Sequence, residues 1–176
     1  MNVVQDLAAR TLLVILAAAV VQDFMYMKIS NRLILMGILF SLAFGFMTGG
    51  LRQVLYVLVN ISFPVFVLYL FYLLGVLGAG DIKLFSIIGG FTNFKLLTGC
   101  MFYSFVAAAV IAVGKMLYNR NLRISVFKAG IFFRSIPREG LVSYHKEWAE
   151  RRNLMHFSVP ILIGYMVAVL HWKLYR

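Results

Sequence analysis

The stretch Gly78-Ala79-Gly80-Asp81 separates two apolar segments and contains one of only six acidic residues in the 176-residue chain. A carboxylate at the end of a membrane segment is energetically costly unless other groups stabilise it, so Asp81 is a candidate functional residue. Two glycines separated by one residue allow tight turns and the close approach of another chain. We therefore expect the surrounding apolar segments to position the Asp81 carboxylate.

The composition is that of a membrane protein. Hydrophobic residues make up 62% of the chain and charged residues 13%, against about 25% charged residues in a typical soluble domain. The sequence predicts an all-α integral membrane protein with a single membrane-embedded domain over residues 1–176. The net charge is +11, but the basic residues cluster in short loops, so membrane topology and anionic lipids explain them better than nucleic acid does.

Cysteine and histidine give no sign of a metal or cofactor. The only cysteine, Cys100, lies inside an apolar run, where structural packing is its simplest role. The chain has no Cys-x-x-Cys pair that would hold zinc, and its three histidines lack the spacing of metal ligands. We therefore expect neither a cofactor nor a metal.

Apolar runs predict about six transmembrane helices, at 7–21, 33–47, 54–77, 82–91, 96–117 and 157–170. The first run is interpreted as a retained helix rather than a cleaved signal peptide. Pro64 is expected to bend the third helix, with Ser62 or Asn60 satisfying the backbone groups that proline leaves unpaired. Asp81 is expected to cap the fourth helix, which is short enough to be re-entrant.

The basic residues indicate how the chain is oriented. Nine of them lie between Lys115 and Arg152, mostly in the polar link at about 118–155. The positive-inside rule makes this link cytoplasmic, and counting back puts Asp23 and Asp81 at the cytoplasmic membrane boundary. Within the link, residues 126–136 have the pattern of an amphipathic helix on the membrane surface. A solvated basic loop fits that segment equally well.

Asp23 and Asp81 are the only acidic residues predicted to lie against the membrane-spanning core on one side. Two neighbouring carboxylates share a proton, so one can take a proton from water while the other polarises a scissile carbonyl. Each residue also fits a structural role, Asp81 as a helix cap and Asp23 as the partner of Lys28 or Arg32. The two together favour aspartic protease chemistry.

The motif Gly78-x-Gly80-Asp81 resembles the signature of the GxGD membrane aspartic proteases, and the specific resemblance is to the type IV prepilin peptidases. That family pairs the motif with an earlier aspartate followed by a stretch that ends in Ile-Pro-Asn. The segment from Asp23 to Asn31 has the aspartate, Ile29 and Asn31 in those places, with Ser30 where proline is usual. The run Pro-Ile-Leu-Ile-Gly at 160–164 also resembles the family's last helix.

The resemblance implies an aspartic endopeptidase that removes the short basic leader of prepilins or pseudopilins at the cytoplasmic face of the inner membrane. Asp23 and Asp81 would be the catalytic pair. Four further residues would position the loop and the substrate backbone: Gly78, Gly80, Ile29 and Asn31. Lys28 and Lys83 are candidates for electrostatic tuning, although the Lys83 side chain alternatively extends to the membrane interface.

Larger members of that family carry an N-terminal domain with four zinc-binding cysteines that is linked to N-methylation. The present sequence lacks those cysteines, so we expect peptidase activity without methyltransferase activity. The short forms resemble the enzymes that serve Flp/Tad-type pili and some archaeal systems. The expected partners are a prepilin precursor and membrane lipids, and the sequence leaves the oligomeric state open.

The sequence is compatible with three alternative functions. One is a GxGD peptidase with another substrate, such as a preflagellin. A second is a small transporter subunit in which Asp23 and Asp81 line a proton or cation pathway, although such a pathway predicts polar residues deep in several helices. A third is a non-catalytic assembly protein of a secretion system.

Overall fold

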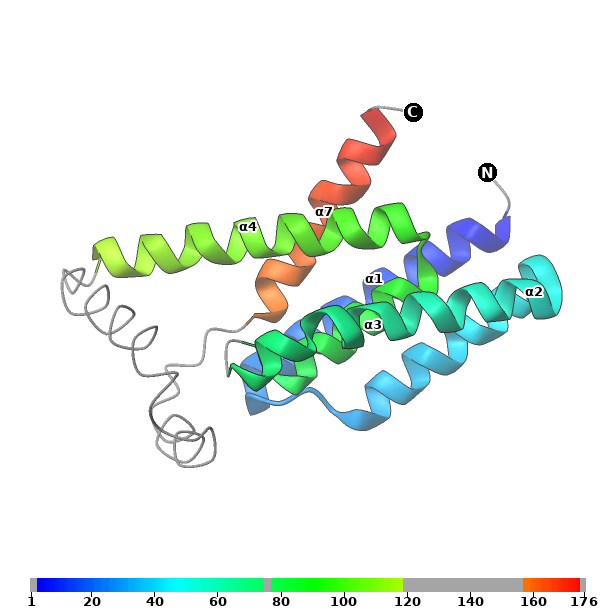
Figure 1. Cartoon of the computed structure of the whole chain (residues 1–176), viewed down its shortest axis with the longest axis horizontal. Coiled ribbons are helices and arrows are strands. Elements are labelled where there is room, and N and C mark those ends of the chain that lie inside the picture. The colour runs from blue at the N-terminus through cyan, green and yellow to red at the C-terminus, as the bar shows by residue number, and fades with distance from the viewer. Residues whose placement is uncertain (1–2, 75–76, 119–156, 175–176) are drawn as a thin grey trace. The chain divides into compact units, whose positions relative to one another are not determined.

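The computed structural model describes residues 3–74, 77–118 and 157–174, and every element in these ranges is a helix (Figure 1). The elements are α1 (Val3–Tyr26), α2 (Asn31–Leu73), α3 (Ala79–Phe91), α4 (Phe94–Tyr118) and α7 (Ser158–Leu174). The all-α prediction is therefore confirmed. The polar link predicted at about 118–155, with its candidate surface helix at 126–136, lies almost wholly outside the described residues.

Helix α2 is a hairpin of two arms, 31–48 and 51–73, joined at Gly49 and Gly50. Gly50 has φ 60° and ψ −148°, a conformation that is essentially restricted to glycine. A Cβ added to Gly45 would lie 3.0 Å from Val57, so the two arms pack against each other. The predicted break at these glycines is confirmed, whereas the second arm ends at Leu73, four residues before the predicted end.

Pro64 lies in the second arm of α2 without breaking it, because the only non-helical dihedral angles within α2 are at Gly49 and Gly50. The two side chains that were predicted to bind the backbone groups left unpaired by Pro64 make other hydrogen bonds. Ser62 Oγ donates a hydrogen bond to Leu58 O, and Asn60 Nδ2 donates to Thr92 O. The side chain of Asn60 therefore joins α2 to the turn that follows α3.

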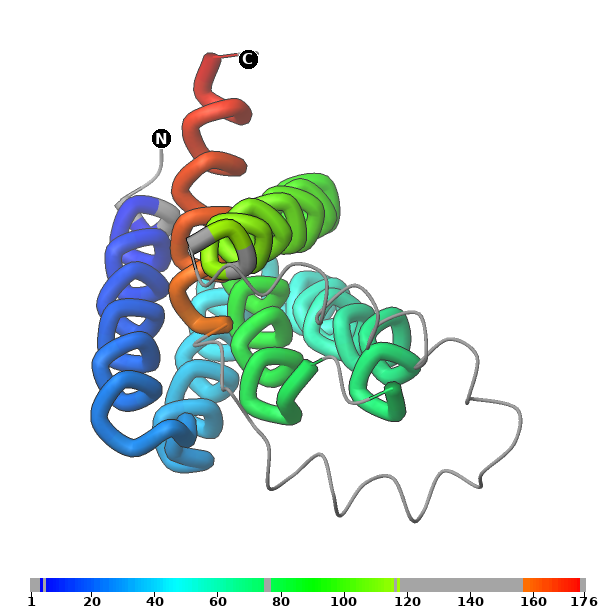
Figure 2. The backbone as a smooth tube through the Cα atoms, turned by 90° about the vertical axis from the view of Figure 1, so that its left-hand side faces the viewer, coloured from blue at the N-terminus to red at the C-terminus, as the bar shows by residue number. Residues whose placement is uncertain are grey.

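Helix α3 packs against both arms of α2 and is the most buried helix of the described chain (Figures 1 and 2). A Cβ on Gly90 would lie 2.5 Å from Ser41 Oγ in the first arm, and one on Gly89 would collide with the Asn60 carbonyl in the second. These two glycines therefore allow α3 to lie in close contact with both arms.

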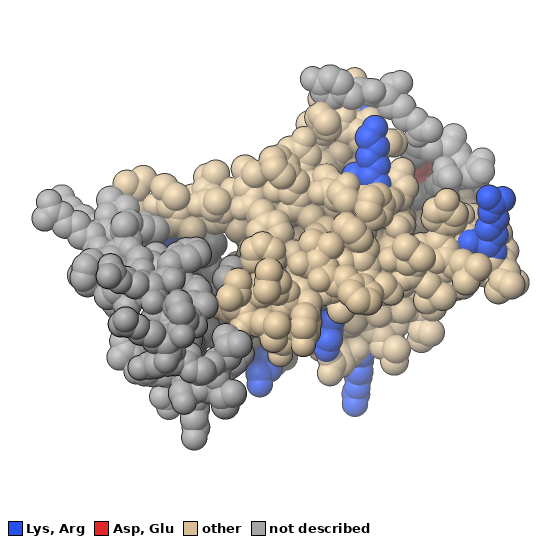
Figure 3. All heavy atoms as spheres, viewed as in Figure 1, with Lys and Arg blue, Asp and Glu red and all other residues tan. Residues whose placement is uncertain are grey.

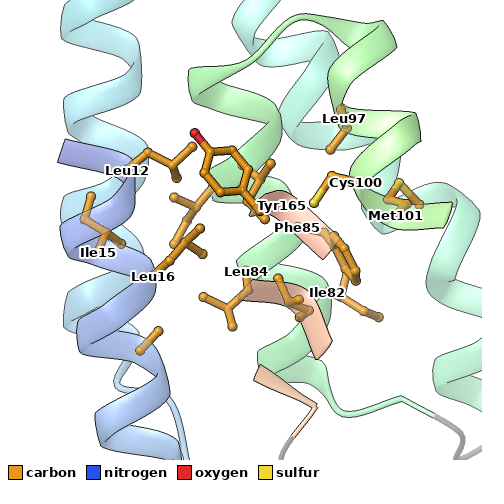
Figure 4. Packing of buried hydrophobic residues seen from close by; sticks show 14 of the residues in the cluster. Leu12, Ile15, Leu16, Ile82, Leu84, Phe85, Leu97, Cys100, Met101 and Tyr165 are labelled. Carbon is orange, nitrogen blue, oxygen red and sulfur yellow. The ribbon is translucent and has the colours of Figure 1, made fainter. Parts of the chain in front are cut away.

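The buried core joins α3 to the other four described helices, and Figure 4 shows part of it. Phe85 of α3 is fully buried, as are Leu16 of α1, Cys100 of α4 and Ile161 of α7. On the face shown in Figure 3, uncharged residues form most of the described surface, and Lys and Arg side chains project singly. Many exposed residues are large and apolar, including Phe66 and Leu70 of α2. A helical core with an apolar exterior is the arrangement that a lipid environment requires.

Three of the described helices are long and apolar enough to cross a membrane: α1, α2 and α4. Helix α3 has 13 residues and is therefore about 20 Å long, which is shorter than a bilayer core of about 30 Å. Helix α7 is apolar but also shorter than the other candidates. The structure thus bears out a membrane protein, while the predicted number of six spans stays a prediction.

Contacts divide the chain into two units, residues 1–106 with 156–176, and residues 107–155. The first unit contains both predicted catalytic aspartates. The second contains the end of α4 and residues outside the described ranges, and the prediction of a single domain over 1–176 remains untested.

Candidate active site

Asp23 lies in the last turn of α1. The sequence predicted that this helix would end near residue 21, but it continues to Tyr26. The next residue, Met27, has a φ of 52°, which lies in the left-handed region and ends the helix. Its N–H donates a hydrogen bond to Asp23 O at 2.9 Å. The half-buried Asp23 side chain accepts a hydrogen bond of 2.6 Å at Oδ2 from Ser158 Oγ, in the first turn of α7. A residue 135 positions away in the sequence therefore holds this carboxylate.

Asp81 lies in the first turn of α3, at its third residue rather than at the N-cap. The predicted capping role was therefore wrong in detail, because Gly78 is the N-cap residue. Asp81 Oδ2 accepts a hydrogen bond of 3.0 Å from Gly78 N, and Asp81 N donates to Gly78 O at 3.1 Å. This arrangement satisfies one N–H at the helix start. The positive end of the helix dipole also favours the negative charge of the Asp81 carboxylate.

The two glycines of the motif have ordinary backbone conformations. Gly78 has φ −80° and ψ 151°, which any residue can adopt, and Gly80 has no positive φ. A Cβ on Gly80 would lie 3.4 Å from Ile29 Cδ1, an ordinary van der Waals distance. Neither glycine is therefore required by its own backbone conformation, and the expectation of room for an approaching chain is still untested.

The link after α1 contacts the first turn of α3. Ile29 packs beside Gly80, and Asn31 Oδ1 accepts a hydrogen bond of 3.0 Å from Lys83 Nζ. The residues of the predicted Asp-to-Asn segment thus lie against the residues of the glycine motif. Lys83 gains a role that the sequence did not suggest, because its ammonium group ties α3 to α2. Lys28 lies exposed in the same link.

Ser30 serves the link in two ways. It is the N-cap residue of α2 and accepts a hydrogen bond at Oγ from Arg32 N, while its own N–H donates to Gln22 Oε1 at 3.0 Å. Its φ of −65° is the value that a proline would impose. Serine therefore reproduces the backbone geometry of the usual proline and adds two hydrogen bonds.

Both aspartates lie at the same end of the first unit, where α1 ends and α3 and α7 begin (Figure 2). Phe157, just before α7, packs edge-on against Phe85 of α3, with their ring centroids 6.5 Å apart. This contact places the start of α7 at the same end. Asp23 lies at the negative end of its own helix dipole, so the hydroxyl donor at the start of α7 offsets an unfavourable position. The end of α1 with Asp23 and the start of α3 with Asp81 therefore lie at the same end of the first unit.

Sequence reasoning missed Ser158 and Gln22, which bind the predicted site residues. Ser158 falls within the helix predicted at 157–170, and no pattern in the sequence singled it out. Gln22 had no signal, because its contact depends on how the chain turns after α1. Within the described ranges, no group of three His, Cys, Asp or Glu side chains forms a candidate metal site.

A model of the type IV leader peptidase family matches residues 11–113, which include Asp23, the Ile29–Asn31 segment and the Gly78–Asp81 motif. The match covers more than half of the chain, from α1 through most of α4, and ends before α7. No curated protein and no solved structure gives a significant match. On this evidence the chain belongs to the type IV leader peptidase family, whose members are membrane peptidases.

Proposed function

We propose that this protein is a membrane aspartic endopeptidase that uses Asp23 and Asp81 as a catalytic pair. The observation that carries the proposal is the position of both carboxylates at the end of the first unit where α1 ends and α3 and α7 begin. Their separate hydrogen bonds, from a serine hydroxyl and from a backbone N–H, hold each carboxyl group in a defined place. Family membership supports peptidase chemistry for this pair.

The reaction follows from the chemistry of two carboxyl groups that share one proton. The ionised carboxylate takes a proton from water as the water oxygen attacks the scissile carbonyl carbon, and the protonated partner donates its proton to the carbonyl oxygen. The tetrahedral intermediate then collapses as the C–N bond breaks: the carboxyl group that took the proton from water gives it to the leaving amine, and one hydroxyl of the intermediate returns its proton to the other carboxylate. Water is consumed, the pair regains its starting protonation, and no cofactor takes part.

The proposed substrate is a prepilin-like precursor with a short basic leader, of the kind found in Flp/Tad-type systems. Leader peptidase membership supports a prepilin-type substrate. The basic link between α4 and α7 supports cleavage at the cytoplasmic face of the inner membrane. A preflagellin is the nearest alternative substrate.

The test is a cleavage assay on membranes that contain the parent, Asp23→Asn or Asp81→Asn, with a prepilin from the same genome. Asparagine keeps an acceptor oxygen for Ser158 or Gly78 but cannot exchange a proton, so both variants should fold. We expect the parent to remove the leader, as seen by gel shift and N-terminal sequencing, and each variant to lose about 100- to 10,000-fold in rate, the usual contribution of one general acid or base.

Cleavage at the parental rate by both variants, at equal protein levels, would show that the aspartates are structural. A transporter or assembly role would then become the better explanation. Cleavage of a preflagellin but not of a prepilin would leave the chemistry in place and change the substrate.

A further inference from the structure

Ser158 differs from the other buried serines of the described chain in what its hydroxyl binds. Ser41, Ser86 and Ser104 each donate to a carbonyl three or four residues earlier in their own helix. Ser158 is 1% exposed and donates instead to the Asp23 carboxylate on another helix, at 2.6 Å. This short distance is typical of a hydroxyl bound to a charged oxygen.

The start of α7 is held firmly in the place that this contact requires. Phe157 packs edge-on against Phe85 and Phe105, with ring-centroid distances of 6.5 and 5.9 Å. Ile161 is fully buried, and its N–H donates to Phe157 O at 3.1 Å. Because the residues on both sides of Ser158 are fixed by packing, its hydroxyl has little freedom to leave Asp23.

We propose that Ser158 is a positioning residue that keeps Asp23 in its catalytic orientation through both of its protonation states. The inference rests on the proposed function, because it assigns a role in that reaction. A hydroxyl can donate a hydrogen bond to a carboxylate and accept one from a carboxylic acid. As Asp23 gains and loses a proton, the hydroxyl hydrogen of Ser158 rotates and the Oγ–Oδ2 contact persists.

The two aspartates differ in this respect. The partner of Asp81 Oδ2 is the N–H of Gly78, which can only donate. A proton on that oxygen of Asp81 would break the contact, whereas a proton on Asp23 Oδ2 merely reverses it. Ser158 therefore gives Asp23 a partner suited to a group whose protonation changes during the reaction.

The experiment compares the full-length parent with Ser158→Ala, Ser158→Thr and, as a matched control, Ser86→Ala. Ser86 is also buried, lies on α3 and donates to Ile82 O within its own helix. Initial rates of prepilin cleavage give kcat and KM separately at equal amounts of folded protein.

We expect Ser158→Ala to lower kcat by about 10- to 100-fold with KM within about twofold, because a hydrogen bond to a charged group is lost. Ser158→Thr should recover most of kcat, and Ser86→Ala should match the parent.

Parental kcat in Ser158→Ala would overturn the inference, as would an effect confined to KM. A thermal unfolding cycle with Ser158→Ala, Asp23→Ala and the double variant tests the contact without activity, because each single change removes one of its two partners. Non-additive shifts in Tm are expected, and additive shifts would show that the two side chains do not interact. A parent that cleaves nothing would overturn the proposed function itself, whereas a cutting parent with an unaffected Ser158→Ala would overturn only this inference.

Discussion

Lys83 Nζ donates a hydrogen bond of 3.0 Å to Asn31 Oδ1 and thereby joins the first turn of α3 to the first residue of α2. The two residues are 52 positions apart in the sequence, and Ile29 packs beside Gly80 only a few residues away. The link that follows Asp23 and the turn that carries Asp81 are therefore held together by a polar and an apolar contact. This connection holds the two sequence motifs against each other.

Replacing Lys83 by Met should loosen that connection while keeping the aliphatic part of the side chain. We expect a loss of about 0.5–1.5 kcal/mol in the free energy of unfolding, because one hydrogen bond at a partly exposed position is removed. Prepilin cleavage should also slow, because the Ile29–Asn31 segment is less firmly held against α3. Thermal unfolding of Lys83→Met, Asn31→Leu and the double variant measures the free energy of interaction between the two side chains.

Lys115→Met is the matched control, since Lys115 is an exposed lysine near the end of α4. It should change neither stability nor cleavage. Equal effects of Lys83→Met and Lys115→Met would mean that the hydrogen bond to Asn31 contributes nothing beyond a general loss of positive charge.

Gly89→Ala should destabilise the protein strongly. An added Cβ would collide with the backbone carbonyl of Asn60, which cannot rotate away as a flexible side chain can. Helix α3 would have to move away from the second arm of α2, at a cost of about 1–3 kcal/mol or more. Thermal unfolding in detergent measures this loss, and Gly99→Ala is the control, because a Cβ there meets nothing within 4 Å.

Gly99→Ala lies within α4 and should be neutral or stabilise the protein by about 0.5–1 kcal/mol, since alanine favours the helix more than glycine does. If Gly89→Ala were as stable as Gly99→Ala, α3 would not lie as close to α2 as the structure has it.

Gly80→Ala separates the structural role of the motif from its role toward a substrate. The added Cβ would meet Ile29 Cδ1 at 3.4 Å, an ordinary contact, so the variant should fold with at least parental stability. Cleavage should nevertheless fall by about 10-fold or more if the substrate backbone passes over this position, because a methyl group then occupies its path. Cleavage at the parental rate by a stable Gly80→Ala variant would contradict such a path.

The sequence predicted the described helices well because apolar runs and turn residues leave local signals. Apolar runs marked each described helix, and Gly49-Gly50 marked the hairpin turn, where Gly50 adopts a conformation that suits glycine. The end of α1 was missed, because Asp23 and Tyr26 are helical despite the polar character of that stretch. A charged residue stays in a helix when a distant group binds it, and the distant group here is Ser158.

The contacts around the site were not predictable for the same reason. Which side chain Lys83 binds, and which hydroxyl reaches Asp23, depends on how α3 and α7 pack against α1 and α2. Periodicity places a residue on a helix but does not say which neighbour it faces. The pairing of Asp23 with Asp81 was predicted from their expected place on one side of the membrane and from the pattern of a known family, since spacing in the sequence carries no information about distances between helices.

Ser30→Pro tests whether the serine at this position replaces the usual proline or improves on it. The φ of −65° suits proline, and a compatible proline stabilises a protein by about 0.4–1 kcal/mol through the unfolded state. Against this, the variant loses the N–H bond to Gln22 and the cap on Arg32 N, which together contribute about 1–3 kcal/mol. The losses exceed the gain, so we expect a net destabilisation of about 0.5–2 kcal/mol.

The matched variants are Ser30→Ala, which loses only the cap, and Gln22→Ala, which loses only the side-chain acceptor. In thermal unfolding, Gln22→Ala should be destabilising when it is made in the parent. It should have no effect when it is made in Ser30→Pro, where the N–H that binds Gln22 is already gone. Cleavage by Ser30→Pro should remain close to parental, because proline keeps the backbone path that brings Ile29 to Gly80. A stable but inactive Ser30→Pro would instead assign the serine a direct part in the reaction.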